Sequence, residues 1–156
     1  IAAASSDVRL RSVEDLRPDA CINYTTEDLK ARARELSDGG VDAVYDPVGG
    51  ELAEPALRSL GFDGTFLVVG FAAGTIPRLP LNQILLRNRR VVGVEWGGWR
   101  AVHPQTQDEM MGRLLAWQTQ GELTPAEPET YPLDDVVQAL AAVNGRRVVG
   151  KAALVP

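Results

Sequence analysis

The chain has 156 residues, of which 45% are hydrophobic and 24% charged, so it has the composition of a globular protein and is neither disordered nor collagen-like. With 16 Lys and Arg against 21 Asp and Glu, its formal net charge is −5, which argues against a nucleic-acid surface. The longest apolar stretch, residues 66–73, is far shorter than the roughly 18 residues of a membrane span, so we expect no membrane insertion.

The first residues predict a strand, a helix and a second strand. Residues 1–4 are an apolar run with no turn, cap or Met before it, and we expect the chain to be cut inside a core there. Ser6 and Asp7 form a favourable helix start, and this helix should stop at Pro18. A second short strand is expected over residues 20–24.

The alternation of strands and helices continues along the chain. The segment 25–28 opens an amphipathic helix that ends at Gly39 and Gly40. Beyond it we expect strands over 41–45, 64–71 and 91–96, with helices over 50–60 and 80–87 between them. The strand 64–71 is so apolar that both of its faces must be covered, which is typical of parallel sheets. The pattern predicts an α/β fold with a doubly wound parallel sheet.

The carboxyl-terminal part departs from this pattern. A helix is expected over 103–120, with a buried apolar stripe formed by Met110, Met111, Leu114, Leu115 and Trp117. Prolines and acidic residues gather in 122–129 and mark a change of composition. A helix over 133–143 and a last strand over 148–155 follow, and this tail could pack on something other than the sheet.

Ligands of open α/β sheets bind beyond the carboxyl ends of the strands, so the residues after the first strand are candidates. An NAD-preferring domain usually has Asp or Glu after its second strand, whereas an NADP-preferring domain has small or cationic side chains there. Here Ser5 and Ser6 are small, and the Arg9 guanidinium could fork onto a phosphate. Spacing alone favours a plainer interpretation, in which Ser6 caps a helix and Arg9 is solvated, and Asp7 argues against a phosphate site.

The remaining glycine-rich and aromatic motifs allow more than one interpretation. No G-x-G-x-x-G motif occurs, so a phosphate-cradling turn is expected to precede Ile1. The segment 46–50 is either a tight turn of a kind common after strands or a border of the ligand cleft. Trp96 and Trp99 are expected in packing or subunit contacts rather than stacked on a substrate.

The single His and the single Cys give no sign of a catalytic or metal centre. His103 is expected at the surface near a helix start, and no nucleophile elbow, triad or metal-ligand cluster accompanies it. Cys21 lies in an apolar strand and is expected to be a buried small hydrophobe. Because one cysteine forms no intramolecular disulfide and no signal peptide is visible, we expect a cytoplasmic protein.

Several segments, in the same order along the chain, resemble zinc-independent quinone oxidoreductases, a branch of the medium-chain dehydrogenase/reductase superfamily. They are Ile-Asn-Tyr (22–24), Tyr-Asp-Pro-Val-Gly-Gly (45–50), Leu-Val-Val-Gly-Phe-Ala (67–72), Pro-Leu-Asn (80–82), Val-Val-Gly-Val (91–94) and Val-Gly-Lys (149–151). The resemblance covers essentially the whole chain, but it covers only about the second half of such an enzyme.

The resemblance implies an incomplete Rossmann fold. A dinucleotide-binding domain over 1–121 would lack its first strand and Gly-rich turn, and a tail over 122–156 would pack on a GroES-like catalytic domain that is absent from the chain. Because the first strand of such a sheet is central, its absence should leave two half-sheets with facing unpaired edges. The last strand, 148–155, should lack its usual partner, and the edge strand 91–96 implies a homodimer paired across a two-fold axis.

The resemblance also implies NADPH as the cofactor and a set of residues that contact it. The implied contacts are Ser5, Arg9 and Tyr24 around the 2′-phosphate, Gly70, Phe71 and Ala72 along the nicotinamide carboxamide, and Arg146 near the carboxyl terminus. Arg9 stands in place of the usual lysine, which keeps the charge and adds a fork. The loop contacts would be made largely by backbone groups, and Arg147 is the alternative to Arg146.

The activity that the resemblance implies is hydride transfer from NADPH to a quinone or another small conjugated carbonyl. The catalytic residues would belong to the absent half, so the chain alone should be inactive. An enal or enoyl reductase of the same superfamily uses the same cofactor and a similar cleft. A non-catalytic nucleotide-binding or assembly fragment is the alternative from a different functional class.

Overall fold

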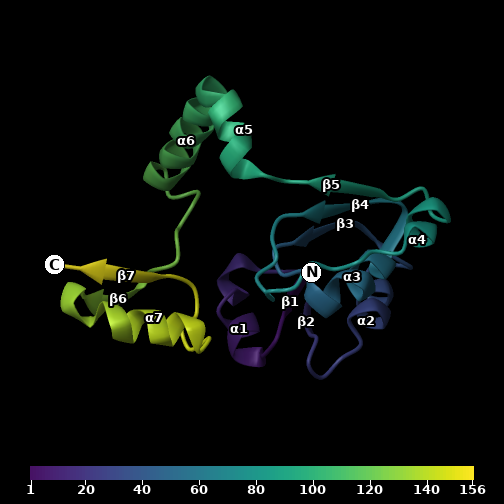
Figure 1. The fold of residues 1–156 in the computed structure, drawn as a ribbon, viewed down its shortest axis with the longest axis horizontal. Helices are drawn as coiled ribbons and strands as arrows, with labels where there is room; N and C mark the ends of the chain where they lie inside the picture. Colours follow the sequence, from purple (N-terminus) through teal and green to yellow (C-terminus); the bar gives the residue numbers. More distant parts are fainter. The chain divides into compact units, whose positions relative to one another are not determined.

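The computed structural model describes all of residues 1–156 and divides into two compact units, Ile1–Trp96 and Gly97–Pro156. Their helices and strands are labelled in Figure 1. The first unit contains the strand ends that the sequence marks as candidate ligand sites, and the second contains the predicted tail. None of the helices is both long enough and apolar enough to cross a bilayer.

The first unit alternates strands and helices, as the sequence predicts. In chain order its elements are β1 (Ala2–Ala4), α1 (Asp7–Arg11), a 3-10 helix (Glu14–Leu16), β2 (Cys21–Asn23), α2 (Leu29–Glu35), β3 (Val41–Asp46), a 3-10 helix (Gly50–Leu52), α3 (Ala53–Ser59), β4 (Leu60–Val68), α4 (Leu81–Leu85) and β5 (Arg90–Gly93). The fifth strand is shorter than predicted, because Gly93 pairs with Val68, the last residue of β4. Trp96, predicted as the end of that strand, instead begins a helix.

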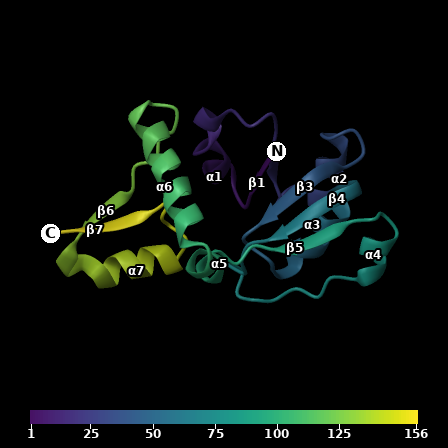
Figure 2. The same ribbon diagram turned by 90° about the horizontal axis from the view of Figure 1, so that it is seen from above.

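The strands of the first unit form separate parallel sheets, β1–β2 and β3–β4–β5. The three strands of the second sheet lie side by side in Figure 2. The prediction of two half-sheets rather than one continuous sheet is therefore confirmed. An open cleft of about 1080 Å³ lies between them, which we call the strand gap. Ile1 and Ala3 line it from the side of β1, and residues 41–46 line it from the side of β3. The edges of β1 and β3 that border the strand gap have no strand partner.

The core of the first unit lies between α3 and β4. Its fully buried side chains are Ala53, Leu57, Leu60 and Phe66. The spacing of Ala53 and Leu57 places both on one face of α3, which packs against β3 and β4. In the smaller sheet Ile22 is buried, with 1% of its surface exposed, whereas Cys21 is exposed. The expectation of a buried Cys21 is wrong because successive side chains of a strand point to opposite faces, and Ile22 occupies the buried one.

Arg89 is a buried charged residue that the sequence analysis did not single out. Its guanidinium, 5% exposed, donates to the carbonyl oxygens of Gly61 at 3.4 Å and Gln83 at 3.3 Å, and also to that of Leu60. Burial lowers the pKa of Arg89, with further lowering by nearby arginines. These bonds join the start of β4 to the segment that follows α4.

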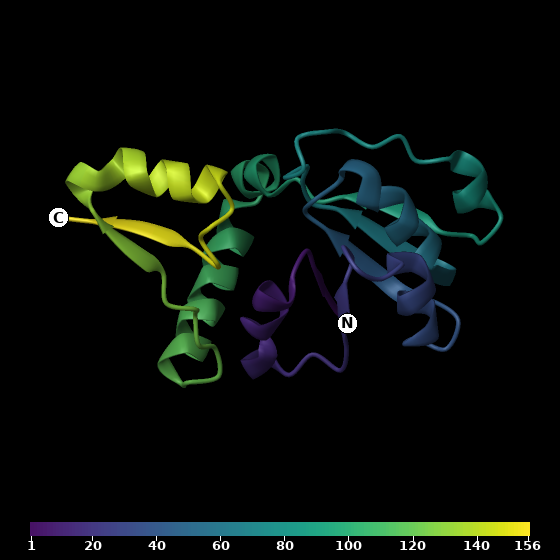
Figure 3. The same ribbon diagram turned by 90° about the horizontal axis from the view of Figure 1, so that it is seen from below.

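The helix α5 (Trp96–Val102) begins at the last residue of the first unit. The second unit continues with α6 (Pro104–Thr119), β6 (Glu129–Pro132), a 3-10 helix (Leu133–Asp135), α7 (Val136–Asn144) and β7 (Ala152–Val155). β6 and β7 pair in parallel, with Glu129 opposite Ala152, and α7 runs alongside them (Figure 3). A small core of Tyr131, Ala139, Ala142 and Val148 holds this arrangement.

One prediction for the carboxyl-terminal part is wrong, and one strand was not predicted. The last strand, β7, pairs with β6, which forms from a segment that the proline-rich composition did not mark as a strand. The absence of a usual partner for the last strand, in a catalytic domain, stays a prediction. The apolar stripe of α6 was expected to be buried, yet its members are exposed, from Met110 at 36% to Leu115 at 57%. The core of this unit is formed by β6, α7 and β7, and it leaves the stripe uncovered.

Candidate functional site

The parallel pairing of β1 with β2 brings predicted site residues to one edge of the sheet. Ala4 lies opposite Asn23, so Ser5 and Tyr24 follow side by side at the carboxyl ends of the two strands. The Tyr24 N–H donates to the Ala4 carbonyl at 3.1 Å. The Thr25 Oγ1 lies 3.3 Å from the Ser5 carbonyl oxygen, so Thr25 also sits beside the end of β1.

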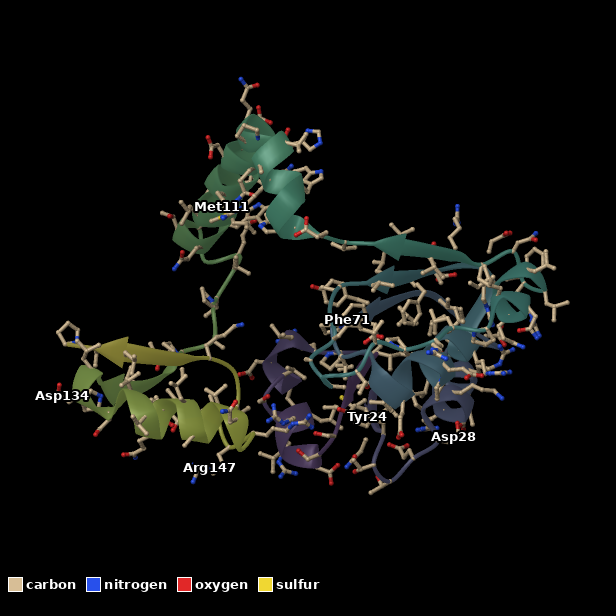
Figure 4. All side chains as sticks on the ribbon, in the orientation of Figure 1. Tyr24, Asp28, Phe71, Met111, Asp134 and Arg147 are labelled. Atoms are coloured by element: carbon tan, nitrogen blue, oxygen red, sulfur yellow. The ribbon has the colours of Figure 1, made fainter.

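Arg9 belongs to α1, the helix that starts at the same edge. The Ser6 hydroxyl accepts a hydrogen bond from the Arg9 N–H at 3.4 Å, so the predicted helix cap is confirmed. Arg9 is half-buried and lies within the first turn of α1. Ser5, Arg9 and Tyr24 are therefore gathered near one strand edge, where Figure 4 labels Tyr24. Their role at a phosphate stays a prediction.

A polar network centred on Asn23 underlies this edge. Asn23 is 8% exposed, and its Nδ2 donates to Asp7 Oδ1 at 2.7 Å. Its Oδ1 accepts from the Thr25 N–H at 3.2 Å and from the Thr25 hydroxyl at 2.7 Å. The Asn23 N–H donates to Glu27 Oε1 at 2.9 Å. The loops that follow β1 and β2 are thereby joined through one buried amide.

The sequence did not predict this network. Asp7 stood there only as an argument against a phosphate site, and Asn23 only as part of a resemblance motif. The two residues lie 16 positions apart, so no local spacing connects them. The signal that could have found the pair is their placement at the carboxyl ends of neighbouring strands in the predicted order.

The segment after β3 is a tight turn held by Asp46. Asp46 is 9% exposed, and its Oδ1 accepts from the N–H groups of Val48 at 2.8 Å and Gly49 at 2.9 Å. Gly49 has φ of 66°, a left-handed conformation that favours glycine. The interpretation of this segment as a turn is confirmed. Asp46, Pro47 and Val48 also line the strand gap, as Tyr24 does.

The loop after β4 packs directly on this turn. The N–H groups of Gly70 and Ala72 donate to the carbonyls of Asp46 at 3.3 Å and Pro47 at 3.1 Å. A Cβ on Gly70 would lie 3.2 Å from the Pro47 oxygen. Phe71, labelled in Figure 4, is 41% exposed. The structure therefore places Gly70, Phe71 and Ala72 beyond the carboxyl end of β4, supported by the Asp46 turn.

The other candidate residues lie in the second unit or at its start. Arg146 follows α7 with a left-handed φ of 54°, and its predicted contact with a cofactor stays a prediction. His103 is exposed and directly precedes α6, as expected. Its ring centroid lies 5.1 Å from that of Trp99. Trp96 is 45% exposed, and its expected role in packing or subunit contacts stays a prediction.

The chain does not assemble a metal-ligand set of the usual kind. No group of three or more His, Cys, Asp or Glu side chains occurs that could hold a metal ion. Zinc sites in proteins take three or four such side chains. The residues present therefore do not fit a zinc ion held by this chain alone.

Comparisons with known proteins agree on one family. Residues 16–154 match the zinc-binding dehydrogenase family. Quinone oxidoreductase-like protein 2 of Bos taurus is 35% identical over 99% of the chain, which spans 44% of that protein. A quinone oxidoreductase from Pseudomonas syringae is 27% identical with a TM-score of 0.87, covering 99% of this chain and 48% of that one. A mycobacterial protein, Rv1454c, solved in complex with NADPH, is 25% identical with a TM-score of 0.80, covering 99% of this chain and 49% of that one.

The chain thus spans about half the length of the proteins that it matches. The similarity covers both units, and it includes the strand ends and loops described above, since it extends over 99% of the residues. The mixed α/β arrangement with parallel strands matches the Rossmann-type domain of quinone oxidoreductases. The chain therefore belongs to the zinc-binding dehydrogenase family.

Proposed function

We propose that the chain is the cofactor-binding part of a zinc-independent, NADPH-dependent oxidoreductase that reduces a quinone or a similar conjugated carbonyl. The observation that carries this proposal is the edge formed by the ends of β1 and β2. Small side chains follow β1 at Ser5 and Ser6, where an NAD-selecting domain has an acidic residue. The similarity to proteins named quinone oxidoreductase and to one solved with NADPH supports the same conclusion.

At the adenosine end we propose Ser5, Arg9 and Tyr24 as the residues that hold the 2′-phosphate. Hydroxyl groups on Ser5 and Tyr24 can donate hydrogen bonds to phosphate oxygens, and the Arg9 guanidinium can form two parallel bonds. The pairing of β1 with β2 fixes Ser5 beside Tyr24, and the Ser6 cap fixes the start of the helix that carries Arg9. These residues therefore bind and orient the cofactor.

At the nicotinamide end we propose that the loop 70–72 holds the carboxamide. Gly70 and Ala72 direct their N–H groups to carbonyls of the Asp46 turn. We therefore assign the carboxamide contact to the backbone of Phe71, whose ring also limits the access of water. Bound NADPH supplies the hydride.

The whole protein is proposed to be a cytoplasmic homodimer whose catalytic residues lie outside this chain, so that the chain alone is inactive. The proposed dimer contact is the free edge of β5, a strand that pairs only with β4. Val91 and Val92 on this strand are 40% and 43% exposed. A second copy of β5 paired across a two-fold axis would cover them. The tail over 122–156 is proposed to pack on the catalytic half.

Calorimetric titration with NADPH and with NADH tests the proposed function. The unchanged chain is expected to bind NADPH more tightly than NADH. Arg9→Ala should weaken NADPH binding by about 1.5–3 kcal/mol, about 10- to 100-fold, because a hydrogen bond to a charged group is lost. Arg11→Ala, on the same helix, is the matched control and should leave both affinities unchanged.

Two outcomes contradict the proposal. One is a chain that binds neither nucleotide. The other is a chain whose preference for NADPH survives Arg9→Ala or is lost equally in the Arg11→Ala control.

A further inference from the structure

We infer that Asn23 is a specificity-determining residue, which preserves the preference for NADPH by holding the exposed Asp7 carboxylate against the buried end of β2. This inference rests on the proposed function, because it concerns the same strand edge. It assigns a role to Asp7, which argues against a phosphate site at that edge. Asn23 acts through Asp7 and is therefore a positioning residue rather than a direct ligand.

Asp7 lies close enough to the proposed phosphate site to matter. It is two positions from both Ser5 and Arg9, so its Cα lies at most about 7 Å from each of theirs. A carboxylate this near the strand edge would repel a phosphate dianion. It could also accept hydrogen bonds from the ribose hydroxyls of NADH, as the acidic residue of an NAD-selecting domain does. An unrestrained Asp7 would therefore favour NADH.

The structure restrains Asp7 through the side-chain amide of Asn23, whose orientation is fixed by Thr25. Asn23 Nδ2 donates to Asp7 Oδ1 at 2.7 Å. The opposite end of the same amide accepts two hydrogen bonds from Thr25, at 3.2 Å and 2.7 Å. A rotated amide would place its NH₂ group against the Thr25 N–H, so Thr25 fixes which end of Asn23 faces Asp7. With only 8% of its surface exposed, Asn23 is held firmly in this position.

The substitution Asn23→Asp tests this role with little change of shape. It keeps an oxygen that can accept from Thr25, but it replaces the donor to Asp7 with a second carboxylate oxygen, so Asp7 is repelled toward the ligand site. The ratio of the Kd for NADH to the Kd for NADPH is expected to fall about tenfold. A purely structural role would weaken both nucleotides alike and leave the ratio unchanged.

A charge-matched double variant separates position from charge. Asp7→Asn combined with Asn23→Asp has the net charge of the unchanged chain and restores a donor facing an acceptor, with the carboxylate now at the buried position. The ratio of the two Kd values should return to within about twofold of the unchanged chain. The single change Asp7→Asn retains the Asn23 network and should leave the ratio unchanged or raise it.

Calorimetry on all four proteins, with thermal unfolding as a check on folding, decides the inference. A ratio unchanged by Asn23→Asp overturns it, as does a ratio that the double variant fails to restore. If Asn23→Asp does not fold, a lower ratio in Asp7→Asn would still overturn it. These results leave the proposed function standing when the unchanged chain prefers NADPH. An unchanged chain that binds neither nucleotide overturns the proposed function and this inference together.

Discussion

Replacing Asp46 should destabilise the first unit, because its carboxylate holds the turn that follows β3. Its Oδ1 accepts two backbone N–H groups, from Val48 at 2.8 Å and from Gly49 at 2.9 Å. Hydrogen bonds to a charged group contribute about 1.5–3 kcal/mol each, and water can replace part of that at a turn that borders a cleft. We therefore expect Asp46→Ala to lower the free energy of unfolding by about 2–4 kcal/mol. Asp46→Asn retains the acceptor oxygen without its charge, and it should cost about half as much.

Urea denaturation of the chain measures this effect. Asp42→Ala is the matched control, because Asp42 is an exposed residue of the same strand. It should change the free energy of unfolding by less than about 0.5 kcal/mol. The turn also supports the loop 70–72, so Asp46→Ala should weaken NADPH binding as well. The reasoning is refuted if Asp46→Ala and Asp42→Ala are equally stable, or if Asp46→Asn is as damaging as Asp46→Ala.

Three further predictions follow from the packing. Arg89→Met should destabilise the chain by about 3 kcal/mol in urea because it leaves buried carbonyls such as that of Leu60 unpaired, whereas an equal effect of Arg90→Met would contradict this. Gly112→Ala in helix α6 should stabilise the chain by about 0.5–1 kcal/mol, since a Cβ there meets nothing within 4 Å, and this should raise the melting temperature slightly. A lower melting temperature would count against it. The hydrogen bond that the Tyr131 hydroxyl donates to Glu129, together with burial, raises the pKa of Tyr131. The stability that this bond contributes is therefore present below about pH 10 and is lost as the pH rises through the raised pKa. Ultraviolet titration should show this phenol ionising late in the unchanged chain and earlier in Glu129→Gln, and identical titrations would contradict the assignment.

Elements governed by neighbouring residues could be predicted from the sequence. The Ser6 cap, the helix stop at Gly39 and the strands 41–45 and 91–96 all depend on contacts a few positions apart, and each was found with its bounds shifted by a few residues. The gap between the half-sheets could also be predicted, because the order of strands in a doubly wound sheet follows from the connections. The relationship to quinone oxidoreductases was likewise visible in short motifs, and the comparisons confirm the family.

Features that depend on contacts between residues far apart in the sequence, or on which face of an element is covered, could not be predicted. The Asp7 to Asn23 bond joins residues 16 apart, and Arg89 reaches Leu60 across 29 positions. The periodicity of α6 predicts an apolar stripe correctly, but periodicity does not say what covers it. Cys21 and Ile22 are both apolar, and which one is buried depends on which face of the β1–β2 sheet the rest of the chain covers.

The strand gap also determines how backbone amide protons should exchange with solvent. β4 has a hydrogen-bonded neighbour on both sides, whereas β3 has one only, on the side away from the gap. The amides of β3 that point toward β1 should therefore exchange almost as fast as those of an open loop. The amides around Phe66 in β4 should exchange slowest, because they open only when the core beneath them unfolds. Protection should thus decline from β4 toward the gap, and a strand that entered it would slow exchange along two edges at once.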